Sequence, residues 1–290
     1  MALTTRVAGW RERGAEEEVG GRRIHVFRRE GGEPLLLLLH GFPSSSYDWR
    51  HLLEEEREQA VLAFDFLGFG LSEKPADHDY TLAEQADIAE ELVGRHGEGQ
   101  PVFVVAHDMG TSVATELMTR DLSGELEMEL TGALLFNGSM VQEAASPTLG
   151  QRLLRGPLGP VFARLSSERF FRQQLGSVFS PEHPLTEQEA EDQWCLISGR
   201  GGIRLGHKLI SYVDERERFA ERWHGALRDW PKPVSLVWGM LDPVATERVL
   251  DAVLALRPAA PLTRLEEIGH YPQIEDPARL AAALRAALDA

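Results

Sequence analysis

Short apolar segments alternate with amphipathic stretches through the first half of the chain. One of these stretches, residues 81–96, repeats apolar side chains at helical spacing and begins with the capping-box pair Thr81 and Glu84. Segments with the apolar or alternating pattern typical of strands cover residues 21–28, 34–40, 61–66, 102–106 and 130–137. Because strands and helices alternate, we predict a mostly parallel, doubly wound sheet with helices on both faces.

This alternation stops after residue 137. Residues 139–230 are rich in Phe, Arg and Leu at helical spacing and are interrupted by Gly and Pro. The strand and helix pattern then returns, with strands predicted at residues 234–239 and 262–265 and helices at residues 246–256 and 277–288. We therefore expect an α/β core made of residues 1–138 and 231–290, into which residues 139–230 are inserted as a helical lid.

The apolar segment that ends at Ala106 leads directly into a turn centred on Asp108, and a helical pattern starts at Met109. Small residues stand two places before and two places after Asp108, at Ala106 and Gly110. A nucleophile elbow needs small residues at these places because its sharp turn brings strand and helix close together. Asp108 is therefore a candidate nucleophile. The alternative is that Asp108 only caps the amino end of the following helix.

An aspartate nucleophile limits the possible substrates. A carboxylate that attacks an ester gives an anhydride, which is less stable than the ester, whereas attack on a saturated carbon gives a stable alkyl ester. Asp108 therefore indicates an epoxide or an alkyl halide as the substrate.

A second turn follows the apolar strand at residues 34–40 and has the sequence His40-Gly41-Phe42-Pro43. Open α/β sheets bind ligands at the carboxyl ends of their strands, where this turn lies. We expect the backbone N–H groups of Phe42 and Met109 to form an oxyanion hole there. Gly-x-Pro is also a common tight turn without any catalytic role.

Two further candidates follow the later strands. Asp242 comes after the strand at residues 234–239, and His270 comes after the strand at residues 262–265. With Asp108 they give the chain order nucleophile, acid, histidine, which is typical of α/β-hydrolases. We expect His270 to deprotonate a water molecule while Asp242 orients its ring.

Taken together, these motifs resemble the aspartate-nucleophile branch of the α/β-hydrolase superfamily, which contains epoxide hydrolases, haloalkane dehalogenases and fluoroacetate dehalogenases. The resemblance extends over nearly the whole chain and is greatest to the epoxide-hydrolase-like subgroup of mesoderm-specific transcript proteins. The motifs that carry it are His40-Gly41-Phe42-Pro43, residues 65–72, His107-Asp108, Leu209-Ile210-Ser211-Tyr212, Asp242-Pro243 and residues 269–277. The resemblance implies an α/β-hydrolase fold with an inserted lid and a cofactor-free hydrolase.

The leaving group separates the members of this branch. An epoxide oxygen leaves as a basic alkoxide and needs an O–H donor, whereas a halide needs only N–H groups. The resemblance implies that a lid tyrosine is the donor, and Tyr212 occupies the matching stretch. Epoxide hydrolases usually have a pair of tyrosines, but the first lid stretch offers Phe170 and Phe171 instead. His207 or His183 is a possible second donor.

We therefore predict an epoxide hydrolase that converts an apolar epoxide into a vicinal diol. The pocket residues expected from the lid are Phe171, Trp194, His207 and Leu209. A haloalkane dehalogenase with the same triad is the first alternative, with lid Trp194 as the candidate for one indole N–H, although the usual halide-binding positions hold Phe42 and Met109. The alternative from another class is a non-catalytic protein of the same fold that binds a ligand or partner.

Composition limits the partners. The chain of 290 residues has a net charge of −16, so we expect it to bind neither nucleic acid nor an anionic membrane. Cys195 is the only cysteine, and no stretch is apolar for long enough to span a bilayer, which favours a cytoplasmic protein. The expected partners are a small apolar epoxide and water, without a cofactor or metal. A homo-oligomer is possible.

Overall fold

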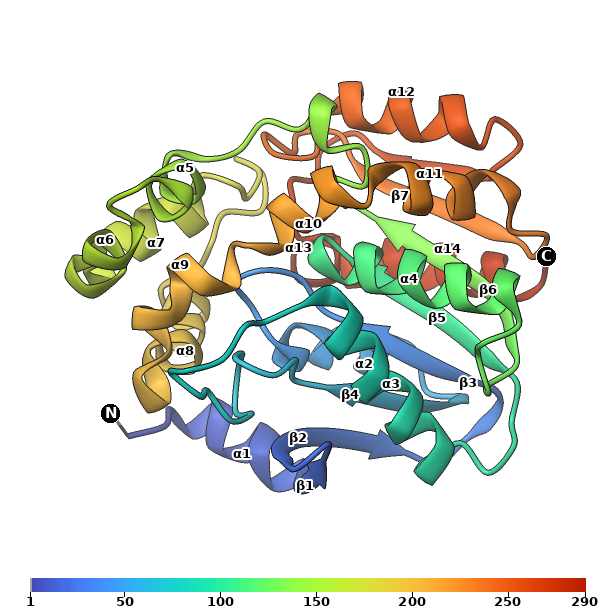
Figure 1. The fold of residues 1–290 in the computed structure, drawn as a ribbon, viewed down its shortest axis with the longest axis horizontal. Coiled ribbons are helices and arrows are strands. Elements are labelled where there is room, and N and C mark those ends of the chain that lie inside the picture. The colour runs from blue at the N-terminus through green and yellow to red at the C-terminus, as the bar shows by residue number, and fades with distance from the viewer. Residues whose placement is uncertain (1) are drawn as a thin grey trace.

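A computed structural model describes residues 2–290. One eight-stranded sheet crosses the molecule in the order β1-β2-β4-β3-β5-β6-β7-β8 (Figure 1). The β1, β2 and β4 strands pair antiparallel, and all the later neighbours pair parallel. The strands are β1 (Gly14–Val19), β2 (Arg22–Arg29), β3 (Gly32–Leu39), β4 (Gln59–Phe64), β5 (Val102–His107), β6 (Leu130–Phe136), β7 (Val234–Gly239) and β8 (Leu262–Leu265). The predicted mostly parallel sheet is confirmed.

Helices cover both faces of the sheet because the central strands are apolar on both sides. In β3, the side chains of Leu35, Leu37 and Leu39 join one buried cluster, and those of Leu36 and Leu38 join the other. The first cluster lies under α3 (Leu82–His96), α4 (Met109–Ser123), α11 (Ala220–Asp229) and α12 (Glu247–Leu256). The second lies under α1 (Thr5–Arg13), α2 (Leu52–Glu55) and α14 (Pro277–Leu288).

The segment between β6 and α11 forms a layer of short helices beyond one end of the sheet, which we call the lid (Figure 1). These helices are η2 (Gln142–Ala144), α5 (Leu149–Arg155), α6 (Gly159–Leu165), α7 (Glu168–Gly176), α8 (Glu187–Ser198), η3 (Gly199–Leu205), α9 (Gly206–Leu209) and α10 (Tyr212–Arg218). Two further short helices, η1 (Ser46–Arg50) and α13 (Pro272–Glu275), belong to loops of the core.

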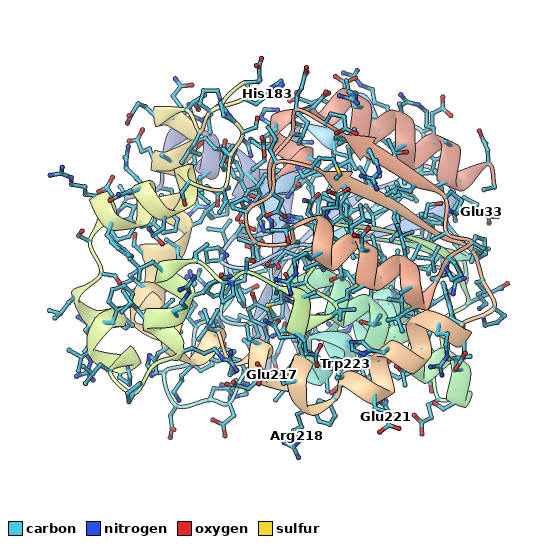
Figure 2. All side chains as sticks on the ribbon, turned by 90° about the horizontal axis from the view of Figure 1, so that it is seen from above. Glu33, His183, Glu217, Arg218, Glu221 and Trp223 are labelled. Atoms are coloured by element: carbon cyan, nitrogen blue, oxygen red, sulfur yellow. The ribbon has the colours of Figure 1, made fainter. Side chains whose placement is uncertain are left out.

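The α11 helix packs on the core, although it lies within the range 139–230 that we expected to form the lid. The Arg222 guanidinium and the Trp223 indole N–H both donate to the buried Glu116 carboxylate of α4. In Figure 2 the Arg218 and Glu221 side chains point outward from this edge of the molecule. The helices that stand over the end of the sheet therefore finish at α10.

A buried carboxylate joins the lid to the amino-terminal helix. The Asp192 side chain of α8 accepts hydrogen bonds from Thr4 at 2.5 Å, from Arg6 at 2.6 Å and from the Tyr47 hydroxyl at 2.6 Å. Near the carboxyl end of α8, the Lys74 ammonium donates to the carbonyl oxygen of Leu196 at 2.8 Å. The α8 edge of the lid is therefore fastened to the core at two places.

Three details differ from the sequence prediction. The pattern indicated neither α1, which buries only Val7 and Trp10, nor the Glu-rich edge strand β1. The β4 strand ends at Phe64, two residues before the expected end, because the Asp65 carboxylate turns to accept two backbone N–H groups of loops.

Among residues 2–290, no helix has the length and apolar character needed to cross a membrane.

Candidate active site

Asp108 lies in the sharp turn between β5 and α4, with φ 42° and ψ −109°. This strained conformation turns the side chain away from the helix, and it makes no capping hydrogen bond to α4. A Cβ on Gly110 would lie 2.2 Å from the carbonyl oxygen of Leu39, so this position accepts only glycine without displacing the end of β3. The geometry is that of the expected nucleophile elbow and does not fit the alternative of a helix cap.

The neighbouring turn after β3 aims a backbone N–H at this carboxylate. The N–H of Phe42 donates to Oδ2 of Asp108 at 2.9 Å. Met109, whose N–H we expected beside that of Phe42, is buried and is the first residue of α4. The structure thus brings Phe42 to the carboxylate, and Oδ1 of Asp108 has no hydrogen bond from the turn.

A buried histidine fixes the shape of that turn. One ring nitrogen of His40 lies 2.8 Å from the carbonyl oxygen of Gly41, and the other accepts the N–H of Phe66 at 2.9 Å. A carbonyl only accepts and a backbone N–H only donates, so the ring must be the neutral tautomer with its proton on Nδ1. Burial lowers the pKa of His40 to about 4, which agrees with a neutral ring.

His270 and Asp242 form a buried pair, as the sequence predicts. Nδ1 of His270 lies 2.7 Å from Oδ2 of Asp242. The carboxylate is itself held by the N–H of Val244 at 2.7 Å and by the side-chain amide of Asn137 at 2.8 Å. Burial alone would lower the pKa of His270, but the negative charges of Asp242 and Asp108 outweigh it and raise the pKa to about 9.

Two supporting residues of this pair were not among the sequence candidates. Asn137 directly follows β6 with φ 45°, and its side-chain oxygen also accepts the N–H of Gly239, so it connects the carboxyl ends of β6 and β7. The His107 ring lies next to His270. Its Nε2 is 2.8 Å from the backbone carbonyl oxygen of His270, and its Nδ1 is 3.0 Å from the side-chain amide nitrogen of Gln273. Burial lowers the pKa of His107 well below its ordinary value, so this ring is neutral. A polar residue directly after a buried strand was the one available signal for Asn137.

Tyr212, the candidate donor, is buried at the start of α10 and packs against Phe42, whose backbone N–H binds Asp108. Its ring centroid is 5.6 Å from that of Phe42. Burial and the nearby negative charge of Asp108 raise the pKa of the Tyr212 hydroxyl above its ordinary value. The phenol is therefore protonated over the whole neutral range.

Arg216 is the main residue that the sequence analysis missed. It lies one helical turn after Tyr212 and is buried, with its guanidinium carbon 4.7 Å from the centre of the Tyr212 ring. Nη2 donates to the backbone carbonyl of Asp108 at 2.8 Å and lies 3.8 Å from Oδ1, while Nε donates to Ser112 at 2.7 Å. One cation thus contacts both the candidate nucleophile and the candidate donor.

A cavity of about 120 Å³ lies between the lid and the core, and Phe42 and His270 line it, whereas Asp108 and Tyr212 do not. It reaches the core at Phe42, His270 and Tyr271, and most of its wall is apolar. The lid contributes residues from α5 to α9, which include Gln151, Leu154, Phe162, Phe170, Phe171 and Leu209. Two of the expected pocket residues, Phe171 and Leu209, therefore line the cavity.

The other expected lid residues do not line it. Trp194 packs behind Phe171 at a ring distance of 5.6 Å, and its indole N–H has no hydrogen-bond partner. His207 lies against Gly159 on the far side of α9. His183 lies at the outer edge of the molecule in Figure 2. The sequence placed these residues in the lid but could not show which side of each helix faces inward.

The site has no arrangement that would hold a metal. Within residues 2–290, no three His, Cys, Asp or Glu side chains converge as a metal site would require. The polar groups that converge are a carboxylate, an imidazole with its own carboxylate, a phenol and a guanidinium. These groups can perform nucleophilic attack, proton transfer and charge stabilisation.

Comparison with known proteins agrees with this architecture. Residues 36–283 match the family described as "Alpha/beta hydrolase family". LipZ of Mycobacterium tuberculosis, which is named only as a hydrolase, is 50% identical over 277 residues, covering 96% of both chains. The mesoderm-specific transcript protein of Mus musculus is 36% identical over 288 residues, covering 95% of this chain and 85% of its own.

Solved structures with a similar fold have lower identity. The haloalkane dehalogenase DatA from Agrobacterium tumefaciens C58 superposes with a TM-score of 0.75 at 21% identity, covering 95% of this chain and 96% of its own. The epoxide hydrolase CorEH superposes with a TM-score of 0.72 at 19% identity, covering 95% of this chain and 98% of its own. At this level of identity, the likeness shows a shared fold and leaves the reaction open.

Proposed function

Because the chain belongs to the α/β-hydrolase family, we propose that it is an epoxide hydrolase that opens an apolar epoxide with Asp108 and releases a vicinal diol. The observation that carries this proposal is the carboxylate at the elbow, with Oδ2 bound to the N–H of Phe42 and a buried phenol, Tyr212, packed against the Phe42 ring. A carboxylate forms a stable product only with a saturated carbon, and a phenol beside it serves a leaving oxygen.

In the first step, Oδ1 of Asp108 attacks a ring carbon of the epoxide, and the carbon–oxygen bond breaks. The Tyr212 hydroxyl gives its proton to the leaving oxygen, which yields a hydroxyalkyl ester on Asp108. Negative charge thereby passes from the carboxylate to the phenolate. Arg216 contacts both groups, so its positive charge stays beside the negative charge throughout the step.

In the second step, water cleaves the ester. Once Asp108 is esterified, its negative charge no longer raises the pKa of His270, so the imidazolium more readily gives up its proton. This proton restores the phenol of Tyr212 through solvent, and the neutral imidazole can then act as a base. His270 then takes a proton from water, and the hydroxide attacks the carboxyl carbon of Asp108. The N–H of Phe42 stabilises the resulting oxyanion, and collapse of the intermediate returns the carboxylate and releases the diol.

The arrangement favours an epoxide over a halide as the substrate. A departing halide needs N–H groups directed at the halide itself. The N–H of Phe42 is already bound to Asp108, and Trp194 is separated from the cavity by Phe171. Most of the cavity wall is apolar, so the proposed substrate carries an aromatic or medium-length aliphatic group.

The decisive experiment measures diol formation by the purified protein from styrene oxide and aliphatic epoxides, without added metal or cofactor. Halide release from 1-bromobutane is measured in parallel. We expect diol from the wild type and none from Asp108→Ala, with both proteins equally folded by circular dichroism. Release of halide without diol, or full activity of Asp108→Ala, would contradict the proposal.

A covalent intermediate separates this route from direct attack by water. His270→Gln should open the epoxide and then stall, because no base activates the water. Intact-protein mass spectrometry should then find a mass increase equal to one epoxide, located on Asp108 by peptide mapping. An unmodified variant protein under excess epoxide would contradict the two-step route.

A further inference from the structure

Large exposed apolar side chains gather on two helices of the lid. Of the seven large apolar residues that are exposed among those described, five lie between residues 149 and 165. Leu158 and Leu165 are the most exposed, at 70% and 77%. We call these five residues the apolar patch: Leu149, Leu153, Leu158, Val161 and Leu165. Scattered exposed leucines are ordinary, but a cluster of this kind marks a contact surface.

The patch lies on the outer face of α5 and α6, and the inner face of the same helices lines the cavity. In α5, Leu149 and Leu153 face outward while Leu154 lines the cavity. In α6, Val161 and Leu165 face outward while Phe162 lines the cavity. These helices are therefore apolar on both sides, and they lie at the end of the molecule farthest from α14 (Figure 1). One layer of helices separates the patch from the cavity.

The charge around the patch is opposite to that of the whole protein. Residues 144–167 contain no Asp or Glu, although the chain has 46 acidic residues. Three exposed arginines accompany the patch without an acidic partner among the described residues: Arg152, Arg164 and Arg169. The net charge of −16 led us to expect no anionic membrane as a partner, but that argument treats the charge as evenly spread. Residues 144–167 are therefore locally basic, with Arg152, Arg155 and Arg164 and no acidic residue.

We propose that α5 and α6 bind the surface of an anionic lipid bilayer. Helices that lie in a membrane interface combine exposed apolar side chains with arginines that reach lipid phosphates. A second copy of the chain fits less well as the occupant, because a symmetric dimer through this patch would bring the unpaired arginines of both copies together. On the bilayer, only the layer formed by α5 and α6 would separate the cavity from the phase in which apolar molecules dissolve. The proposal does not depend on the reaction assigned to Asp108.

The test is sedimentation of the full chain with vesicles of phosphatidylcholine and phosphatidylglycerol, mixed at about 2:1, and with vesicles of phosphatidylcholine alone. We expect the wild type to sediment with the anionic vesicles and to be released by salt. Leu158→Ser combined with Leu165→Ser should weaken binding by about tenfold or more, because two exposed leucines no longer enter the lipid. Arg164→Glu should weaken binding to the vesicles that contain phosphatidylglycerol and leave binding to vesicles of phosphatidylcholine unchanged.

Two controls separate the possible outcomes. Leu122→Ser removes a leucine of α4 that is 45% exposed and far from the lid, so it should bind like the wild type. Asp108→Asn should also bind the anionic vesicles like the wild type, because vesicle binding does not use the active site. The membrane proposal can therefore hold even if the reaction assigned to Asp108 is wrong. A wild type that stays in solution with both kinds of vesicle would overturn the proposal. So would a dimer, found by light scattering, that the two serine substitutions dissociate while vesicle binding is absent.

Discussion

The guanidinium of Arg216 lies against the ring of Tyr212, with its central carbon 4.7 Å from the ring centroid, and its other side faces Asp108. In the proposed reaction, charge leaves the carboxylate and appears on the phenolate, and both groups contact this one cation. An arginine fixed by hydrogen bonds to Ser112 and the Asp108 carbonyl need not move during the transfer. Such preorganised charge is the usual source of large rate effects.

Arg216→Met should therefore slow formation of the alkyl ester by about 10²–10³-fold. Stopped-flow single-turnover measurements report this step separately from hydrolysis of the ester. Arg216→Lys keeps a charge but loses the forked hydrogen bonds, so it should recover part of the rate. A variant with normal alkylation and an unchanged melting temperature would show that the guanidinium has no part in the reaction.

Tyr212→Phe should lower epoxide turnover by about 10²–10³-fold, because the leaving oxygen loses its proton donor. The loss should be smaller for epoxides with electron-withdrawing substituents, whose oxygen leaves as a weaker base. Tyr80→Phe is the matched control, since the Tyr80 hydroxyl donates to the carbonyl of Pro75. Equal losses for strongly and weakly basic leaving oxygens would argue against proton donation by Tyr212.

The protonation of His270 should depend on its two carboxylate neighbours. Its pKa is raised to about 9, so the free protein should hold an imidazolium at neutral pH. Asp108→Asn removes one of the two negative charges and should lower the pKa, as measured by NMR titration of the ring. Asp242→Asn should lower it further. This raised pKa stabilises the folded protein fully below about pH 6.5, and the contribution is lost as the pH rises through about 9. An unchanged titration in Asp108→Asn would contradict the proposed coupling.

The protein should lose stability in acid through its buried neutral histidines. His40 has a pKa of about 4 in the fold, so between the ordinary value of 6.5 and about 4 only the unfolded chain takes up this proton. The free energy of unfolding should fall with pH over that interval and level off below it. His40→Gln should make the fall shallower in urea titrations at several pH values, whereas His183→Gln, at the edge of the molecule, should not. Identical slopes for both variants would be inconsistent with a neutral His40.

The elbow should not tolerate a methyl group at Gly110. A Cβ there would lie 2.2 Å from a backbone oxygen of β3, so Gly110→Ala should lower the free energy of unfolding by about 1–3 kcal/mol or more. Gly94→Ala is the matched control, because a Cβ at this position of α3 meets nothing within 4 Å. That substitution should raise stability by about 0.5–1 kcal/mol through the better helix propensity of alanine. Thermal and urea unfolding measure the stability of both variants. A Gly110→Ala variant as stable as the wild type would contradict the predicted clash with the end of β3.

Much of the core follows from local sequence patterns. The β7 and β8 strands and the α14 helix lie at the residues that the sequence predicts; β7 is a short, fully buried run, and the buried side chains of α14 recur at helical spacing. The structure also pairs His270 with Asp242, because each follows a strand at the same edge of the sheet. By contrast, α1 is polar apart from two buried side chains, and β1 buries only Val19, so neither has a clear period.

The lid follows less completely from the sequence. Helical spacing predicts helices over residues 139–230, but their orientation over the core depends on contacts between distant residues. Phe171 lines the cavity, and Trp194 lies behind it, although both are aromatic residues of lid helices. Arg216 had no signal, because arginine on a helix is usually solvated and its burial depends on two partners in α4 and the elbow.

The hydrogen bonds from Thr4, Arg6 and Tyr47 to Asp192 also bear on how members of this family can be recombined. A lid transplanted from a relative brings its own residue to the position of Asp192 but leaves the host's amino-terminal helix behind. If the donor and host differ there, a buried carboxylate or its donors lose their partners, which is costly in a protein interior. Chimaeras designed to transfer substrate preference should therefore exchange α1 together with the lid.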